Sequence, residues 1–157
     1  MQLLIVRHGK AVESHPDGDR FRALSPLGRE RILTLLPRVQ AKGFSAGVAM
    51  SSPYLRARQT AELFAAAIPA SVSLESQSLT PDAYPADLVK ELREWEAQGV
   101  TSAVVYSHNP FVSELTRWLL AEAFKDTVEF HTPSLWALDF ATGLGPHQGR
   151  PLWVLHP

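Results

Sequence analysis

The chain has 157 residues, of which 45% are hydrophobic and 20% charged, and its formal net charge at pH 7 is −1. This length predicts a single domain over residues 1–157, and the balanced charge argues against a nucleic-acid or membrane partner. The absence of cysteine excludes disulfides, thiolate catalysis and Cys-ligated zinc. Because the sequence shows no signal-peptide pattern and no apolar run near the ~20 residues of a membrane span, we expect a cytoplasmic protein.

Strands and helices are expected to alternate along the first half of the chain. Ser25 and Pro26 are typical of a helix start, a hydroxyl cap followed by proline, and Gly43 closes this helix. Pro37 predicts that the helix is kinked or split in two. In order, we expect a strand at 2–6, a loop at 10–24, the helix from Pro26 to Gly43, a strand at 46–50 and a helix that opens at Ser51-Ser52-Pro53.

The same alternation continues to the end of the chain. We expect a strand near 72–75, a loop at 76–85, a helix at 86–98, a strand at 102–106, a helix from about 110 to 124, and strands at 134–140 and 152–155. Such alternation is typical of βαβ units. It predicts an α/β fold, a three-layer α/β/α sandwich with a mostly parallel central sheet.

Polar residues follow three of these strands at the point where each strand ends. Ligands of parallel α/β sheets bind at the carboxyl edge, so we expect two histidines and two arginines to converge there. The three ends read Arg7-His8-Gly9, Ser51-Ser52-Pro53 with Arg56 one helical turn later, and Ser107-His108-Asn109.

This set of side chains predicts a site for a phosphoryl group. The guanidinium groups of Arg7 and Arg56 offer donors suited to oxyanions. The helices after Pro53 and Pro110 add positive dipole ends, and Gly9 leaves room for a ligand to approach the backbone.

His8 is the candidate nucleophile, because a neutral imidazole can attack phosphorus and form phosphohistidine. Arg7 and Arg56 disfavour its protonation and neutralise phosphoryl oxygens in the transition state. Taken alone, a strand-end histidine is usually an ordinary loop residue, and a helical arginine is usually a surface charge. The conjunction with Ser-Pro-x-x-Arg and a second strand-end histidine, His108, favours the reactive interpretation.

These segments resemble the histidine phosphatase superfamily, which includes the phosphoglycerate mutases. LIVRHG at 4–9 is similar to its signature, and further similar segments follow in the family's order as far as about residue 140. These are LSPLGRER (24–31), SSPYLRARQTAE (51–62) and VVYSHNP (104–110). The short length and SLTPDAYP (78–85) resemble the SixA-type phosphohistidine phosphatases most closely. The resemblance implies a phosphoglycerate mutase-like fold.

The resemblance also implies roles for the site residues. His8 would be the phosphorylated nucleophile, and Arg7, Arg56 and His108 would bind the phosphoryl oxygens. Gly9, Ser52 and Asn109 are further candidates for phosphate binding. The family needs no metal or organic cofactor, and the implied partner is a signalling protein that bears phosphohistidine.

Two positions depart from the family pattern. Many larger members carry a glutamate that serves as general acid for an alkoxide leaving group; Asp82 is the nearest candidate here. Lys10 stands where some relatives have an acidic residue. An alkoxide needs a proton in the transition state, whereas the imidazole of phosphohistidine can be protonated beforehand, so a missing acid favours a phosphohistidine substrate.

Other functions are also open to this sequence. The chain could be a small-molecule phosphomonoesterase or mutase of the same superfamily, or a phosphate- or phosphopeptide-binding module without turnover. Metal binding is the weakest alternative, because none of the histidines has the i,i+4 spacing of a helical ligand pair. We expect His131, His147 and His156 to be structural or exposed, and Thr132 and Ser134 to lie at the pocket rim. The oligomeric state is not predicted.

Overall fold

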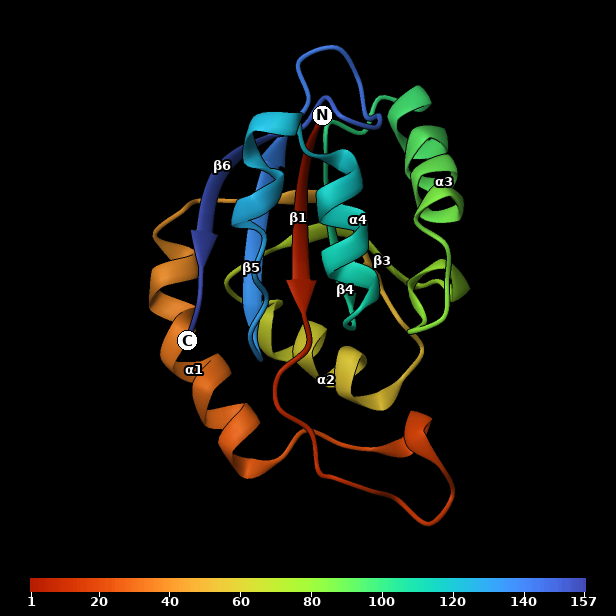
Figure 1. Ribbon diagram of the computed structural model, residues 1–157. Coiled ribbons are helices and arrows are strands. Elements are labelled where there is room, and N and C mark those ends of the chain that lie inside the picture. The colour runs from red at the N-terminus through yellow and green to blue at the C-terminus, as the bar shows by residue number, and fades with distance from the viewer.

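Six strands form one mixed sheet in the order β3-β2-β4-β1-β5-β6, with helices on both faces (Figure 1). The structure is a computed structural model that describes all residues from 1 to 157. The strands are β1 (Gln2–Arg7), β2 (Ala46–Ser51), β3 (Ala70–Glu75), β4 (Ser102–Ser107), β5 (Ser134–Asp139) and β6 (Arg150–Leu155).

Four α-helices cover the sheet, and three short 3-10 helices lie in the connections. The α-helices are α1 (Pro26–Gln40), α2 (Leu55–Phe64), α3 (Pro85–Ala97) and α4 (Phe111–Leu119). The 3-10 helices are η1 (Asp19–Phe21), η2 (Gln77–Leu79) and η3 (Glu122–Thr127). No helix combines the length and the apolar character needed to cross a membrane.

Alternation along β1 divides the core into two layers. Leu3 and Ile5 pack with residues of α3 and α4, whereas Leu4 and Val6 pack with residues of α1 and α2. All four side chains are fully buried, and each such burial stabilises the fold by about 1.5–3 kcal/mol relative to exposure. A strand buried on both faces reads as a continuous apolar run, which is why residues 2–6 show no polar alternation.

The topology brings three strand ends to one edge of the sheet. β2, β4 and β1 are adjacent and parallel, and β3 is parallel to β2. β5 is antiparallel to β1, and β6 is antiparallel to β5. The prediction of an α/β fold with a mostly parallel sheet is confirmed, and the antiparallel pairs are confined to one side of β1.

Two helices differ from their expected extents. α1 is not split at Pro37, because the proline lies in the last turn, where a lost N–H donor removes a single helical bond. The expected cap is present, since the Ser25 hydroxyl accepts the Gly28 N–H at 3.0 Å. α4 ends at Leu119 rather than near 124, because Leu120 turns into extended backbone and pairs with Gly149.

Candidate active site

His8 lies directly after β1 and is fixed by hydrogen bonds to both ring nitrogens. Its Nδ1 is 2.6 Å from the carbonyl oxygen of Gly9. A carbonyl only accepts, so Nδ1 carries the proton and Nε2 keeps its lone pair. Nε2 accepts a hydrogen bond from Nε of Arg56 at 3.2 Å. The unprotonated nitrogen of His8 therefore faces a guanidinium group.

Burial is the main reason that His8 stays neutral. The side chain is only 9% exposed, and this burial, followed by the charges of Arg56, Arg7 and Arg22, lowers the pKa of His8 to about 3. The hydrogen bond to Gly9 acts in the opposite direction. The neutral state was expected from the arginines alone; in the structure, desolvation contributes more.

His108 lies after β4 and faces His8 across the edge of the sheet. The two ring centroids are 5.0 Å apart, with the planes tilted by 59°. Nε2 of His108 is 2.7 Å from Oγ of Ser52, while its Nδ1 is buried without a partner. Burial, with His8 and Arg56, lowers the pKa of His108 as well. Both imidazoles are therefore neutral near pH 7.

Arg56 is held between His8 and a residue that the sequence analysis missed, Asp19. Its Nη1 donates to the Asp19 carbonyl at 2.8 Å, and its Nη2 lies 3.0 Å from the Asp19 carboxylate. Arg22 binds the other carboxylate oxygen at 2.7 Å. Its hydrogen bond, together with that of Arg56, lowers the pKa of Asp19. The carboxylate is ionised and orients both arginines.

Arg7 lies at the end of β1 and points toward the segment that precedes β5. Its Nη1 donates to the carbonyl oxygen of Phe130 at 2.7 Å, and its Nε is buried without a partner. Burial lowers the pKa of Arg7. Thr60 links the neighbouring elements, because its hydroxyl accepts the Gly9 N–H at 3.0 Å and donates to the Arg56 carbonyl at 2.7 Å.

Gly9 packs closely against α1. A Cβ at this position would lie 2.8 Å from Cδ1 of Ile32 and 3.1 Å from Cδ2 of Leu24. The missing side chain therefore makes room for α1. Gly28 is similarly constrained, because a Cβ there would overlap the backbone of Lys10. The Lys10 carbonyl accepts the Ser25 N–H at 2.9 Å, so the backbone at residue 10 anchors the start of α1.

The remaining candidates are less closely connected with the two histidines. Oδ1 of Asn109 accepts from the Ser113 hydroxyl at 2.7 Å at the start of α4. Asp82 is exposed, and its carboxylate makes no hydrogen bond or ion pair. Its loop nevertheless lies near His108, because the Ser107 hydroxyl donates to the carbonyl of Leu79 at 2.6 Å. Asp82 therefore lies in a loop at this edge of the sheet, but its carboxylate is not hydrogen-bonded to either histidine.

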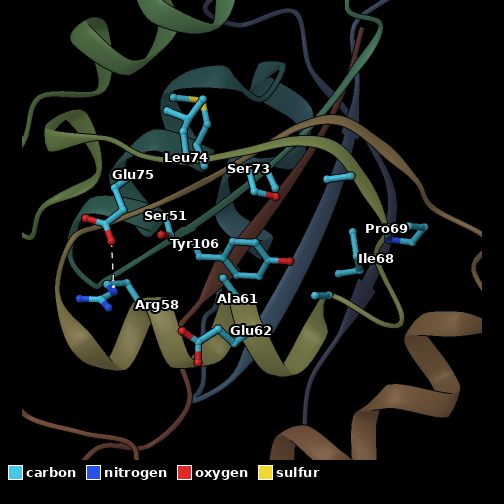
Figure 2. A pocket seen from close by; sticks show the side chains of 14 residues that line it. Ser51, Arg58, Ala61, Glu62, Ile68, Pro69, Ser73, Leu74, Glu75 and Tyr106 are labelled. Carbon is cyan, nitrogen blue, oxygen red and sulfur yellow. Dashed lines mark ion pairs between the residues drawn. The ribbon is translucent and has the colours of Figure 1, made fainter.

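Two cavities of similar volume lie in the surface of the protein. One, of about 590 Å³, lies between α2 and β3, and Figure 2 shows the hydroxyl of Tyr106 pointing into it. The Arg58–Glu75 ion pair, 3.1 Å long, also lines this cavity. The second cavity is lined by Arg7 and Thr132, so Thr132 does lie beside the candidate site.

Ser134 does not line either cavity, and nothing resembles a metal site. The Ser134 side chain is fully buried, and its Oγ accepts the His131 N–H at 2.6 Å and lies 2.9 Å from Nδ1 of His156. No group of three or more histidine, aspartate, glutamate or cysteine side chains is gathered closely enough to hold a metal ion.

Comparison with known proteins extends the resemblance. Residues 3–77 match the family model of the histidine phosphatase superfamily (branch 1). An uncharacterized protein of Picosynechococcus sp. is 35% identical over 130 residues, which cover 81% of this chain and 76% of the relative.

Solved structures share the fold. The protein histidine phosphatase SixA in complex with tungstate superposes with a TM-score of 0.85 at 24% identity, over 99% of this chain and 96% of that one. A structure from Agrobacterium tumefaciens assigned as SixA superposes with a TM-score of 0.80 at 21% sequence identity, over 99% of this chain and 97% of that one. A phosphoserine phosphatase of Entamoeba histolytica superposes with a TM-score of 0.64 at 12% sequence identity, over 98% of this chain and 95% of that one. With the motifs, the relative and the fold in agreement, this chain belongs to the histidine phosphatase superfamily.

Proposed function

We propose that this protein is a metal-independent phosphatase that transfers a phosphoryl group to Nε2 of His8 and then to water. We further propose that its substrate is a phosphohistidine residue in a protein. The observation that carries the proposal is the state of His8: buried, neutral, and with its unprotonated Nε2 hydrogen-bonded to Arg56.

In the first step, the lone pair of Nε2 attacks phosphorus opposite the leaving group. The new N–P bond forms as the bond from phosphorus to the substrate nitrogen breaks, and the leaving imidazole keeps the electron pair. The proton of His8 stays on Nδ1, which donates it to the Gly9 carbonyl, and this hydrogen bond stabilises the phosphorylated ring. In the second step, water attacks the phosphohistidine, and phosphate leaves with His8 neutral again.

Arg56, Arg7 and His108 would bind the transferring oxygens. Two buried atoms of these three side chains lack a partner, Nε of Arg7 and Nδ1 of His108. A buried polar atom without a hydrogen bond costs about 1–3 kcal/mol, and a phosphoryl oxygen would supply the acceptor for a donor there. Ser52 holds the ring of His108, so in this proposal it positions the histidine. The two guanidinium groups supply the positive charge that phosphoryl transfer requires.

The preference for phosphohistidine depends on the leaving group. A general acid contributes typically ~10²–10⁴-fold to the departure of a poor leaving group, and Asp82 is not hydrogen-bonded to the histidine pair. A protonated imidazole leaves without such help. The likeness to SixA supports this choice, because that protein is a protein histidine phosphatase.

The test is a labelling experiment with a radioactive phosphodonor. We expect an acid-labile, base-stable phosphoenzyme that is absent from His8→Ala and unaffected by a chelator. His147→Asn is the matched control, since His147 is exposed in a distant turn with φ 61°, which asparagine tolerates. Full turnover by His8→Ala would refute the mechanism.

A substrate panel tests the choice of substrate separately. It compares a phosphohistidine-bearing protein domain with sugar phosphates, phosphoserine and phosphoglycerate. We expect the phosphohistidine domain to have the highest kcat/KM. A strong preference for one phosphomonoester would leave the His8 mechanism intact and replace the substrate. Binding of phosphate without hydrolysis of any donor would instead favour a binding module.

A further inference from the structure

The second of the two cavities is cationic and lies beside Arg7, between α1 and the residues that precede β5 and follow β6. Its volume is about 590 Å³, the same as that of the cavity in Figure 2. Successive turns of α1 form one wall, and the residues before β5 and after β6 form the other. Its charged and titratable side chains are Arg7, Glu30, Arg31, Arg38, His131 and His156.

The charges of this cavity are unbalanced. The arginine ion pairs of the molecule involve other residues: Arg22, Arg56 and Arg58. The three arginines of the cavity therefore have no carboxylate partner, and Glu30 is the one acidic side chain in the lining. Even with a carboxylate on Pro157, which also lines the cavity, cations outnumber anions. Such a wall favours a ligand with negative charge.

The wall opposite α1 is held in place by hydrogen bonds. The buried Ser134 hydroxyl joins the His131 backbone to Nδ1 of His156. Nη1 of Arg38 donates to the His156 carbonyl at 3.0 Å, and Nε2 of His131 lies 3.1 Å from the carboxylate of Glu129. This cavity is thus built before any ligand enters, which reduces the entropy cost of binding.

Arg7 lies between the cavity and His8. It precedes His8 in the chain, lines the cavity, and pairs with Ser134 across the β1–β5 ladder. A substrate with its phosphoryl group at His8 can therefore extend past Arg7 toward Arg31 and Arg38. The geometry favours a substrate that carries a second anionic group near the phosphoryl group.

We infer that this cavity is a subsite for a second oxyanion of the substrate, namely the carboxylates of aspartate or glutamate residues that flank the phosphohistidine. This inference rests on the proposed function. A second phosphate on a small molecule has the same chemistry, and the experiment includes both sources. Arg31 is the specificity residue, because its guanidinium makes no hydrogen bond or ion pair within the protein.

The experiment measures kcat/KM for three donors with the wild-type protein, Arg31→Glu and Arg29→Glu. The donors are phosphoramidate, a phosphohistidine peptide with acidic flanks, and the same peptide with amide flanks. Arg29 is the matched control, since it lies on α1, is exposed and does not line the cavity. We expect kcat/KM of the wild-type protein to be about 10-fold higher for the acidic peptide than for the amide peptide. The difference should arise from a lower KM and should shrink in high salt.

Arg31→Glu should abolish this preference, while its turnover of phosphoramidate stays within about two-fold of the wild-type rate, which also shows that the variant is folded. Arg29→Glu should keep the preference. Equal kcat/KM for the two peptides with the wild-type protein would overturn the subsite while leaving the His8 mechanism standing. In a fourth arm, a small bisphosphate that is hydrolysed faster than both peptides and loses that advantage in Arg31→Glu would support the subsite and reassign its ligand.

Discussion

Two pairs of histidines lie at the same edge of the sheet and differ in almost everything except their spacing. The ring centroids of His8 and His108 are 5.0 Å apart, and so are those of His131 and His156. Within the first pair the side chains are 9% and 1% exposed. In the second, the His131 side chain is 50% exposed and its Nε2 contacts the Glu129 carboxylate.

The difference shows what sets His8, the proposed nucleophile, apart from the other histidines. Proximity of two rings does not, since both pairs have it. His8 combines burial, a Gly9 carbonyl that fixes the proton on Nδ1, and Arg56 at Nε2. His156 instead has its Nδ1 2.9 Å from the Ser134 hydroxyl; burial, His131 and Arg38 lower its pKa, and Glu129 acts in the opposite direction. What distinguishes His8 is nearly complete burial together with the Gly9 carbonyl at Nδ1 and the Arg56 guanidinium at Nε2.

Removing the cation beside the nucleophile should have the largest effect. Arg56→Ala loses the donor to His8 and the contacts with Asp19, and in the proposed mechanism it also loses a ligand of the phosphoryl oxygens. We expect kcat to fall about 10³-fold, as for other groups that stabilise developing charge. Single-turnover kinetics measures it. A loss of less than ten-fold would mean that Arg56 does not contact the transferring phosphoryl group.

Removing the second imidazole should have a smaller effect and leave the first step possible. His108→Ala deletes the ring held by Ser52 but not the nucleophile, so we expect kcat to fall about 10²-fold. Phosphoenzyme should still form on His8, more slowly. Complete loss of labelling in a folded His108→Ala protein would show that His108, rather than His8, accepts the phosphoryl group.

Asp19→Asn tests how far the orientation of Arg56 and Arg22 by the Asp19 carboxylate contributes to stability and to kcat/KM. The carboxylate is 54% exposed, and such pairs are screened by solvent, so we expect less than about 1 kcal/mol of lost stability and a two- to five-fold lower kcat/KM. The lowered pKa of Asp19 means that its stabilisation is present above about pH 4 and is lost as pH falls further. Thermal unfolding of the two proteins at pH 3 and pH 7 checks this, and an equal difference in Tm at both pH values would contradict it.

The smallest expected effect is that of mild acid on the first step. With the pKa of His8 lowered to about 3, the rate of phosphoenzyme formation should change less than about two-fold from pH 7 to pH 5, after correction for uncatalysed hydrolysis. An ordinary histidine, with a pKa of about 6.5, would be largely protonated at pH 5. Pre-steady-state labelling measures the rate, and a limb with an apparent pKa near 6.5 would contradict the account.

The same lowered pKa has a consequence for stability with a defined sign. The unfolded chain binds a proton at His8 below about pH 6.5, whereas the folded chain does so only near pH 3. The free energy of unfolding should therefore fall as pH falls between these values. His8→Asn should show a shallower fall in chemical denaturation at pH 7 and pH 5, and identical slopes would contradict the burial of a neutral His8.

The sequence was sufficient to predict the first pair of histidines. His8 and His108 follow continuous apolar runs, and parallel neighbours deliver their ends to one edge, so their convergence follows from topology. The close approach of Gly9 to Ile32 was not predicted, because this contact is visible only once α1 is in place. Asp19 was missed because a polar turn in a loop has no periodicity that relates it to Arg56.

The second cavity could not be predicted for a similar reason. Its residues come from the end of β1, one face of α1 and the two ends of the antiparallel β5–β6 pair. His131 and His156 were expected to be structural or exposed. The contact of His156 with the Ser134 hydroxyl and the exposure of His131 agree with that expectation. Their common cavity with Arg31 and Arg38 depends on the register of β5 and β6, which the Gly/Pro-rich turn before β6 does not reveal.

The most direct test of the central claim is to locate the phosphoryl group on the trapped enzyme. Rapid quenching at alkaline pH, followed by peptide mass spectrometry and phosphorus NMR, identifies both the residue and the ring nitrogen. We predict a single phosphorylated site, Nε2 of His8, because Nδ1 is committed to the Gly9 carbonyl. Phosphate on Nδ1 of His8, or on any of His108, His131 and His156, would contradict the account.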